Sequence, residues 1–515
     1  MFIDSRTLPE NTEVQGDVCI IGAGPAGITL ALELASNNRR IVVFESGGFE
    51  FSAQTQRLFD GEVTEQGFIP LDADRLRFLG GATNHWSGSC RPFDPSEFVG
   101  WPFEITALEN YYRRSQQILQ LGPYSYDPRD WITEQTPLLD FGTSARFENR
   151  MFQYSSPAMR FGVAYRTELQ NADNVSVYLH ANLIDIETNR SASEVSGVAL
   201  ACLNGRRLRA HARHYVLATG GIENARLLLS SDRVRQGGLG NEFDLVGRYF
   251  SDHPVVYNVA TIKFTDPQPK LDFYDTSFVR GQMVQGYIAP SPALRKEQQL
   301  PAFIVGLSLG SNPAGDNAKG SLQIAYKYLL AGHFPRSLKY HAMNILTGVE
   351  RRARKLYYSL PACAPVEYST SYSVELHPDP DSRVTLTNAV DALGMRRVKV
   401  DWRLPGDFIE TLRRAHALLA EELSRHNLGT LRMNPGVNTL KAARNFSSGH
   451  HHMGTTRMHT DPGKGVVDAN CRVHGIGNLF IAGSSVFPTY SSDDPTMTIL
   501  ALTLRLSDHL KSLLT

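Results

Sequence analysis

Residues 17–46 read DVCIIGAGPAGITLALELASNNRRIVVFES, and this stretch decides the fold. A short apolar run at residues 18–21 has the composition of a buried parallel strand, and a glycine-rich turn follows it at once. Leucine and isoleucine then recur among alanines, as in a helix that packs on a sheet, and residues 41–44 form a second apolar run. The pattern predicts a strand, a turn, a helix and a second strand, which together make one parallel βαβ unit.

The glycines of this turn have separate mechanical roles. Gly22 permits the tight turn, Gly24 lets the backbone approach a pyrophosphate, and Gly27 lets the helix pack closely on the strand. The helix N-terminus directs its positive dipole end at the phosphates, and Glu45, about 20 residues on, can accept hydrogen bonds from ribose hydroxyls. A glycine-rich structural turn is the alternative, but the complete βαβ context with its terminal acid favours a dinucleotide site.

Elements of the same kind return later in the chain. Residues 214–231, HYVLATGGIENARLLLSS, predict a strand, a Gly-Gly turn and a helix. Residues 477–489 predict another buried strand, and residues 495–514 predict a helix opened by proline. Between these segments, residues 371–404 alternate like antiparallel strands, and residues 406–427 have the pattern of an amphipathic helix. The chain therefore leaves the cofactor fold and returns to it.

Length and charge limit the class of protein. At 515 residues the chain is long for one core, so two domains, or one domain with a large insertion, are expected. Lys+Arg and Asp+Glu both total 52, and this zero net charge gives no electrostatic case for nucleic acid or an anionic membrane surface. A basic run, ERRARKLYY at residues 350–358, is interpreted as a solvated helix face, with a partner-docking patch as the alternative.

Cysteine usage and the N-terminus indicate a compartment. Five scattered cysteines without a CxxC pair are typical of buried free thiols in a reducing environment: Cys19, Cys90, Cys202, Cys363 and Cys471. The first residues are polar and acidic, unlike a signal peptide, and no apolar run approaches the roughly 18 residues of a membrane helix. We expect a cytoplasmic protein with no membrane segment.

Three separated blocks resemble one family, the glucose–methanol–choline (GMC) flavin oxidoreductases. They are GAGPAG with Glu45, LRFLGGATNHWSG at residues 76–88, and the stretch at residues 451–502 that begins HHMGTTRMHTDPG. YVLATGGIENARLLL and GRYFSDHP, the latter at residues 247–254, also resemble family segments. The resemblance covers both ends and the middle of the cofactor domain, while the region between matches loosely.

This resemblance implies FAD rather than NAD, and an α/β (α+β) fold. A discontinuous Rossmann-like FAD-binding domain would comprise residues 1–95, 165–255 and 446–515, and a substrate domain with an antiparallel sheet backed by helices would comprise 96–164 and 256–445. The typical family reaction oxidises an alcohol, such as a sugar or polyol, to a carbonyl, and oxygen, a quinone or a redox protein takes the electrons. The residues expected to contact FAD are Gly22, Gly24, Pro25, Ala26, Gly27, Glu45, Ser46, Gly80, Gly81, Ala82, His85, Trp86, Ala218, Thr219, Gly220, Gly483, Ser484, Pro495 and Thr496.

Three consecutive histidines, His450, His451 and His452, stand before a Gly-Thr step. In the family motif H-x-x-G-T the histidine three residues before the glycine faces the flavin, and His451 holds that position here. Alcohol oxidation requires a base for the hydroxyl proton, and imidazole, with an ordinary pKa of about 6.5, suits that role. A metal site is the competing interpretation. Adjacent histidines do not converge easily on one ion, and no carboxylate or cysteine cluster accompanies them, so no metal is expected.

The partner position departs from the family pattern. Relatives place a second histidine or an asparagine before a proline near the C-terminus, whereas YSSDDPTMT puts Asp494 before Pro495. Alignment by the proline makes Asp494 the active-site residue and Asp493 the helix cap, and a one-residue slip would exchange them; a loop acid at a helix N-terminus is the neutral alternative. We expect Asp494 to pair with His451 and raise its pKa, to bind a hydroxyl or cation of the substrate, and to share or supply the base function.

The GGATNHW block resembles pyranose oxidases, in which the histidine before the tryptophan carries flavin covalently. His85 holds this position, so a covalent bond and non-covalent packing are both open. Gly80, Gly81 and Ala82 are expected to let the backbone approach the flavin ring. Phe487 and Tyr490, after the last flavin strand, are candidates for the site wall or for the core.

Two other classes of function, besides alcohol oxidation, are compatible with these sequence motifs. The family includes lyases and a decarboxylase, and the altered Asp494 keeps such a reaction open; a binding module with a structural flavin is the third possibility. The expected partner is a small-molecule substrate and not nucleic acid. No pattern in residues 255–445 specifies that substrate, and none specifies the electron acceptor or the oligomeric state.

Overall fold

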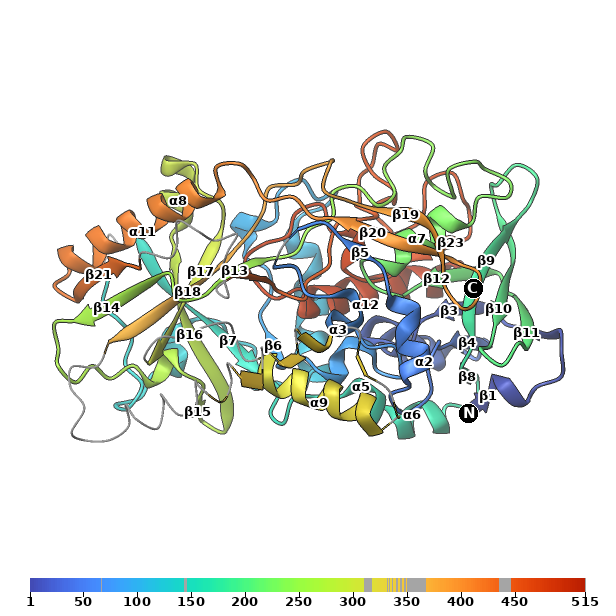
Figure 1. The fold of residues 1–515 in the computed structure, drawn as a ribbon, viewed down its shortest axis with the longest axis horizontal. Coiled ribbons are helices and arrows are strands. Elements are labelled where there is room, and N and C mark those ends of the chain that lie inside the picture. The colour runs from blue at the N-terminus through green and yellow to red at the C-terminus, as the bar shows by residue number, and fades with distance from the viewer. Residues whose placement is uncertain are drawn as a thin grey trace.

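The computed structural model describes the chain except residue 66, residues 143–145, 310–316, 351–366 and 435–445, residue 515, and isolated positions between 331 and 350. Cys363 and the basic run at residues 350–358 lie outside the described residues. The molecule is elongated, with a parallel sheet near the two chain ends and a large antiparallel sheet at the opposite end (Figure 1).

The parallel sheet has six strands, and every neighbouring pair in it is parallel. Its order is β1 (Phe2–Asp4), β8 (Val175–Leu179), β4 (Ile41–Phe44), β3 (Val18–Ile21), β12 (His214–Leu217) and β23 (Leu479–Ile481). The four residues of β3 and of β4 are all buried, because helices cover a parallel sheet on its faces. Helix α1 (Pro25–Leu34) packs against α12 (Thr496–Leu513), which joins the two ends of the chain. The predicted βαβ unit is confirmed, and its two strands have the predicted bounds.

A second sheet of four strands lies beside the parallel one. Its order is β2 (Thr12–Gln15), β11 (Arg207–His211), β10 (Val195–Ala201) and β9 (Asn182–Thr188). A tight turn joins β10 and β11: the Arg206 carbonyl accepts from the Cys202 N–H, and Gly205 has a φ of +93°. Helix α7 (Glu223–Ser230) follows β12, as the sequence pattern predicts.

The antiparallel sheet forms the other end of the molecule. It has a main path of β21 (Gly429–Met433), β14 (Ala260–Phe264), β18 (Tyr368–Val374), β17 (Phe303–Leu309), β16 (Gln282–Pro290), β7 (Phe147–Tyr154) and β6 (Ser89–Cys90), with β13 (Pro254–Val256), β15 (Ser277–Val279) and β22 (Phe446–Ser448) attached beside it. Helix α11 (Phe408–Arg425) packs against β21, and α8 (Pro292–Gln298) lies near it (Figure 1). A mixed α/β fold with two kinds of sheet is thereby confirmed.

A hairpin forms a further, smaller sheet that packs against α7. Strands β19 (Arg383–Val390) and β20 (Arg396–Asp401) form this sheet with β5 (Glu62–Val63). β19 and β20 fall in the range predicted for the substrate domain, whereas β5 falls in the range predicted for the FAD-binding domain. Arg226 of α7 fixes this hairpin, because its guanidinium donates to the Asp391 carboxylate at 2.7 Å and to the Arg396 carbonyl at 2.8 Å. The other α-helices within the described residues are α2 (Ala53–Gln56), α3 (Leu71–Asp74), α4 (Glu109–Ile118), α5 (Phe161–Ala164), α6 (Arg166–Asn171) and α9 (Asn317–Leu330).

The four described cysteines are buried and unpaired, as expected: Cys19, Cys90, Cys202 and Cys471. Among the described helices, none combines the length and the apolar character that crossing a bilayer would require.

Candidate active site

One cavity of about 690 Å³ extends from the ends of the parallel strands to the histidine run. Its wall includes seventeen of the nineteen residues predicted to contact FAD: Gly22, Gly24, Pro25, Ala26, Glu45, Ser46, Gly81, Ala82, His85, Trp86, Ala218, Thr219, Gly220, Gly483, Ser484, Pro495 and Thr496. His450, His451, His452 and Asp494 line the same cavity. The fold therefore brings the nucleotide motif near the N-terminus and the C-terminal histidines to one continuous space.

The strand ends have the shape that a dinucleotide requires. A Cβ added at Gly24, Gly220 or Gly483 would meet no atom within 4 Å, so each glycine borders open space. Gly24 is also the N-cap of α1 and provides no side-chain cap, which leaves the first N–H groups of the helix directed at the cavity. These features fit the pyrophosphate of FAD.

The other two predicted contacts do not reach the cavity wall. A Cβ at Gly27 would lie 1.9 Å from the Gly22 carbonyl oxygen, and one at Gly80 would lie 2.6 Å from the Gly162 nitrogen. Gly27 therefore allows α1 to approach the turn after β3, and Gly80 allows two loops to pack together.

Glu45 ends β4 with its carboxylate buried at the cavity. Its two oxygens accept hydrogen bonds of 2.9 Å from the backbone N–H groups of Ala23 and Gly47. Burial raises the pKa of Glu45, while these N–H donors oppose the rise. The contacts hold the side chain at the position where a carboxylate accepts from ribose hydroxyls, and each oxygen keeps a second lone pair.

His451 is joined to a second histidine that the sequence analysis did not identify. The Nδ1 atoms of His451 and His253 lie 2.9 Å apart, and His253 Nε2 lies 3.3 Å from the Tyr490 carbonyl oxygen. Because a carbonyl only accepts, His253 carries its proton on Nε2 and accepts at Nδ1. His451 must then donate from Nδ1, so its Nε2 presents a lone pair to the cavity.

Both imidazoles are held neutral. Burial, together with the neighbouring His450 and His452, lowers the pKa of His451 to about 3, and burial, together with the neighbouring His451, lowers the pKa of His253 to about 4. The expectation that Asp494 raises the pKa of His451 is wrong, because desolvation and two adjacent imidazoles outweigh one partly exposed carboxylate. A neutral His451 is in the protonation state that a base needs.

Asp494 lies where alignment by the proline places it. Its Oδ1 is 3.5 Å from His451 Nε2, and the side chain is partly exposed to the cavity. Burial raises the pKa of Asp494, against a hydrogen bond from Ser89 and the charge of His253. His451 and Asp494 thus present two acceptors side by side at the cavity wall.

Asp493 does not cap the following helix, contrary to expectation. Pro495 is the N-cap of α12, without a side-chain cap. Asp493 is instead fully buried, 3.4 Å from Arg150 and 3.5 Å from Arg91. Because these guanidinium groups attract the carboxylate into the core, it turns away from the helix end.

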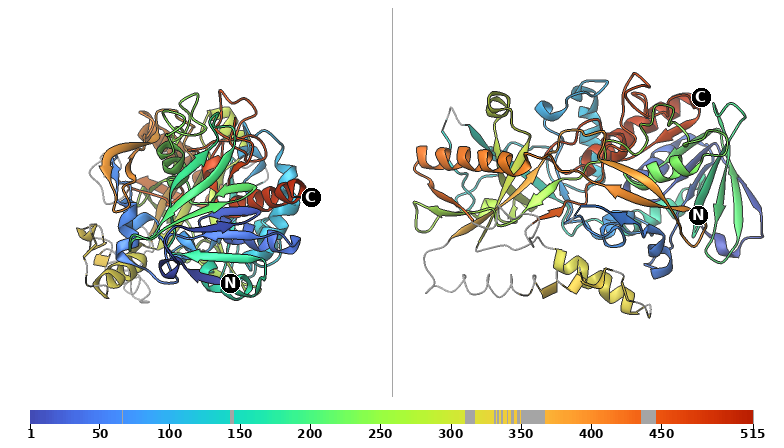
Figure 2. Two further views of the ribbon diagram at one scale, coloured as in Figure 1. Left: turned by 90° about the vertical axis from the view of Figure 1, so that its right-hand side faces the viewer. Right: turned by 45° about the horizontal axis from the view of Figure 1, so that its top comes forward.

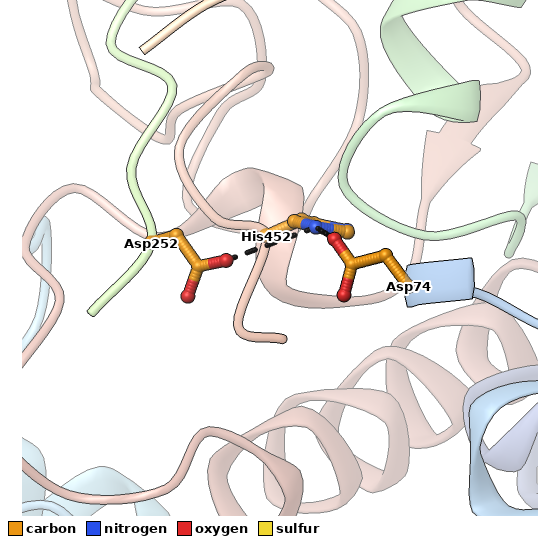
Figure 3. Close-up of side chains that lie close together, drawn as sticks. All are labelled: Asp74, Asp252 and His452. Carbon is orange, nitrogen blue, oxygen red and sulfur yellow. Dashed lines mark hydrogen bonds and ion pairs between the residues drawn. The ribbon is translucent and has the colours of Figure 1, made fainter. Parts of the chain in front are cut away.

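Two carboxylates enclose the histidine next to the candidate base. His452 Nε2 lies 2.5 Å from Asp74 Oδ2 and 3.8 Å from Asp252 Oδ2, and Figure 3 shows the imidazole between the two acids. His450 also bonds Asp74. The carboxylate cluster that the sequence analysis did not see is therefore present, and its ligand atoms lie within 4.8 Å of one another. His452 Nε2 is hydrogen-bonded directly to Asp74, and the absence of a metal site stays a prediction.

Asp252 fixes the backbone of both neutral histidines. Its Oδ1 accepts from the N–H groups of His253 at 2.7 Å, His451 at 2.9 Å and Gly449 at 3.0 Å. Asp252 and His253 belong to GRYFSDHP, which the sequence analysis recognised as family-like without assigning it a role. That segment was the signal from which His253 could have been found.

Three other residues were predicted as site candidates: His85, Phe487 and Tyr490. His85 lines the cavity with its ring centroid 5.8 Å from that of His450, and burial lowers its pKa to about 3. Phe487 and Tyr490 are buried core residues outside the cavity wall, and the Tyr490 hydroxyl donates to the Tyr249 carbonyl at 2.6 Å.

Comparisons with known proteins agree with this geometry. A family profile described as GMC oxidoreductase matches residues 378–503, and one described as FAD dependent oxidoreductase matches residues 17–236. The chain is 25% identical to the fructose dehydrogenase large subunit of Gluconobacter japonicus, over 97% of this chain and 98% of that protein. It is 22% identical to 2-methyl-1,2-propanediol dehydrogenase of Mycolicibacterium austroafricanum, over 96% and 95%.

A solved structure shows the same fold. Pyridoxine 4-oxidase from Mesorbium loti superposes with a TM-score of 0.57 at 18% identity, covering 96% of this chain and 98% of that one. The two profiles match the N-terminal nucleotide segment and the C-terminal histidine segment, which the fold brings to one cavity. The chain therefore contains a C-terminal domain of the GMC oxidoreductases and an N-terminal domain of the FAD-dependent oxidoreductases, and it is an FAD-dependent enzyme.

Proposed function

We propose that this enzyme oxidises a hydroxyl group of a polyhydroxylated small molecule, a sugar or polyol, to a carbonyl, with His451 as the base. The observation that carries the proposal is the hydrogen-bonded pair of His451 and His253, whose geometry leaves His451 Nε2 as a free acceptor on the cavity wall. The seventeen wall residues named above are the proposed FAD contacts, and residues 1–95, 165–255 and 446–515 the proposed FAD-binding domain.

The chain's own groups account for the movement of the proton. A substrate hydroxyl that donates to His451 Nε2 loses its proton to that atom, and His253 Nδ1 stabilises the resulting imidazolium by accepting from the N–H of His451 Nδ1. The Tyr490 carbonyl keeps His253 in the accepting tautomer. FAD, when bound, supplies the acceptor for the hydride that leaves the carbinol carbon.

The substrate class follows from the second acceptor. His451 Nε2 and Asp494 Oδ1 are 3.5 Å apart, a spacing that two hydroxyls on adjacent carbons can meet together. Burial is the main cause that raises the pKa of Tyr154 and of Tyr287 in the antiparallel sheet. The charge of the nearby Asp494 adds to the rise in both. The fructose and diol dehydrogenases named above are relatives that support a polyol as the substrate.

An anaerobic titration tests the function. Purified yellow enzyme is mixed without oxygen with sugars, vicinal diols and mono-alcohols of equal carbon number, and the flavin absorbance is followed. We expect sugars or vicinal diols to bleach the flavin faster than their mono-alcohol counterparts. A lyase or a structural flavin would leave the absorbance unchanged with every compound, and equal rates for diols and mono-alcohols would contradict the role of Asp494. Admitting oxygen or a quinone afterwards identifies the electron acceptor.

His253 offers a test of the tautomer argument. In His253→Leu, His451 loses the acceptor for its Nδ1–H, and we expect the limiting rate of flavin reduction to fall on the order of 10- to 100-fold. His253→Asn should restore part of this loss, because a carboxamide oxygen can accept the same proton. Stopped-flow reduction over a range of substrate concentrations provides the measurement. A rise in the half-saturating concentration at an unchanged limiting rate would show that His253 only shapes the cavity.

A further inference from the structure

Large apolar side chains are exposed on one short segment of the described surface. Of the seventeen large hydrophobic residues that are exposed among the described residues, eight fall within residues 322–349: Leu322, Tyr326, Leu329, Leu330, Phe334, Leu338, Leu346 and Val349. Leu330 is 70% exposed and Phe334 is 68% exposed. Exposed apolar residues gathered in this way mark an interaction surface, whereas single ones scattered over a protein do not.

Helix α9 is apolar on two opposite faces. Ile324, Ala325 and Tyr328 are buried, and Ile324 and Tyr328 pack with Phe51, Ala53, Leu76 and Phe78 in one hydrophobic cluster. Leu322, Tyr326, Leu329 and Leu330, spaced four, seven and eight residues from the first, face outward. By contrast, the outer face of α11 carries charged residues such as Arg413, Arg414 and Glu421. The inner face of α9 explains how the helix is held, and the outer face is left without a role.

The charged residues of this segment are all basic. Residues 317–349 contain Lys319, Lys327, Arg336 and Lys339 and no Asp or Glu, although the whole chain has zero net charge. The basic run predicted at residues 350–358 continues this excess in the sequence. Apolar side chains combined with lysine and arginine match a surface of acyl chains and anionic headgroups. They do not match an acidic protein surface alone, because eight exposed apolar residues would gain nothing from it.

The segment also borders the active-site cavity. Ser321 and Ile324 of α9, and His341 after it, are part of the cavity wall together with His450 and His451. Figure 2 shows α9 projecting at the edge of the molecule, in yellow. Whatever contacts the outer face of α9 therefore lies beside the rim of the cavity.

We propose that the outer face of α9 forms, with the exposed described residues that follow it, an interfacial docking surface through which the enzyme binds an anionic lipid bilayer; these residues are Phe334, Leu338, Lys339, Leu346 and Val349. The helix lies in the plane of the interface with Leu322, Leu329 and Leu330 among the acyl chains, and the exposed Lys339 contacts the headgroups. Lys327 instead packs on the inner face, where its ammonium lies 5.0 Å from the Phe78 ring. This mode of binding needs no membrane-spanning helix. It places the cavity rim at the lipid surface, where a lipid-soluble molecule would have a short path to the site.

Vesicle sedimentation tests the proposal with the full-length holoenzyme. We expect the enzyme to pellet with vesicles of phosphatidylglycerol and phosphatidylcholine, to pellet far less with phosphatidylcholine alone, and to be released at about 0.5 M salt, which screens the headgroup charge. The variant Leu322→Ser/Leu329→Ser/Leu330→Ser should bind about tenfold less or weaker still. The matched control Val99→Ser/Val234→Ser/Phe243→Ser removes three other exposed apolar side chains and should bind like the wild type.

Three outcomes would overturn the proposal. The wild type stays in the supernatant with anionic vesicles, or the two triple variants bind equally, or light scattering shows a dimer that only the α9 variant dissociates. The last result would assign the surface to a second copy of the chain. Equal flavin content and melting temperature in both variants show that each has folded. Because no substrate is used, the result is independent of the proposed alcohol oxidation.

Discussion

His451→Ala is expected to slow anaerobic flavin reduction by the substrate about a thousandfold, at unchanged FAD content. The substitution removes the Nε2 lone pair that receives the hydroxyl proton, and a positioned base contributes 10²–10⁴-fold to such a step. Stopped-flow absorbance measures the rate. His377→Ala is the matched control, because His377 is exposed and is not part of the cavity wall.

The same base predicts an unusual pH profile. His451 acts only when it is deprotonated, and its pKa is lowered to about 3, so the active form persists at all pH values above roughly 4. The rate of flavin reduction should therefore stay level between about pH 5 and 8, without the decline near 6.5 that an ordinary histidine base would give. If the rate of flavin reduction declined near pH 6.5 and His253→Asn shifted that decline, the assignment of His451 as a base with a lowered pKa would be contradicted. An undiminished rate in His451→Ala would contradict it as well. If Asp494→Asn alone abolished reduction, the base would be Asp494.

The βαβ unit and the histidine motif were readable because their information is local. Gly22, Gly24 and Glu45 lie within one strand–turn–helix–strand stretch, and each has a mechanical requirement that only its residue type meets. Asp494 could be placed because Pro495 marks the start of α12. Residue identity and short spacing were sufficient for the βαβ unit, whereas His451 and Asp494 were placed by their resemblance to the family motifs.

The partners of His451 were not readable because they depend on tertiary contacts. His253 lies 198 positions earlier, and its tautomer is fixed by a backbone carbonyl that no motif encodes. The predicted direction of the His451 pKa shift failed for the same reason: one neighbour was known, whereas burial and two flanking imidazoles decide the sign. Asp493 was misassigned because Arg150, which attracts it into the core, belongs to β7. Likewise, zero net charge concealed the basic, apolar segment around α9.

Gly24→Leu is expected to give a folded protein that does not retain FAD. Gly24 has φ −79° and ψ −171°, which any residue adopts, and a Cβ there meets no atom within 4 Å, so the polypeptide accepts the side chain. The leucine would occupy the space where the pyrophosphate meets the N-terminus of α1. Steric overlap and the loss of N–H contacts would together cost about 3 kcal/mol of binding free energy. FAD binding would then weaken about a hundredfold or more.

The contrast with Gly27 makes this prediction specific. In Gly27→Ala the added methyl group would lie 1.9 Å from the Gly22 carbonyl oxygen, so that variant should lose the fold as well as the flavin. The ratio of flavin to protein absorbance, together with the melting temperature measured against wild-type enzyme stripped of FAD, separates the two effects. The melting temperature of Gly24→Leu should equal that of the stripped wild type, because Gly24 borders the ligand space. The melting temperature of Gly27→Ala should be well below it, because Gly27 supports the turn that creates this space. A Gly24→Leu enzyme that is purified fully yellow would show that the phosphates bind elsewhere.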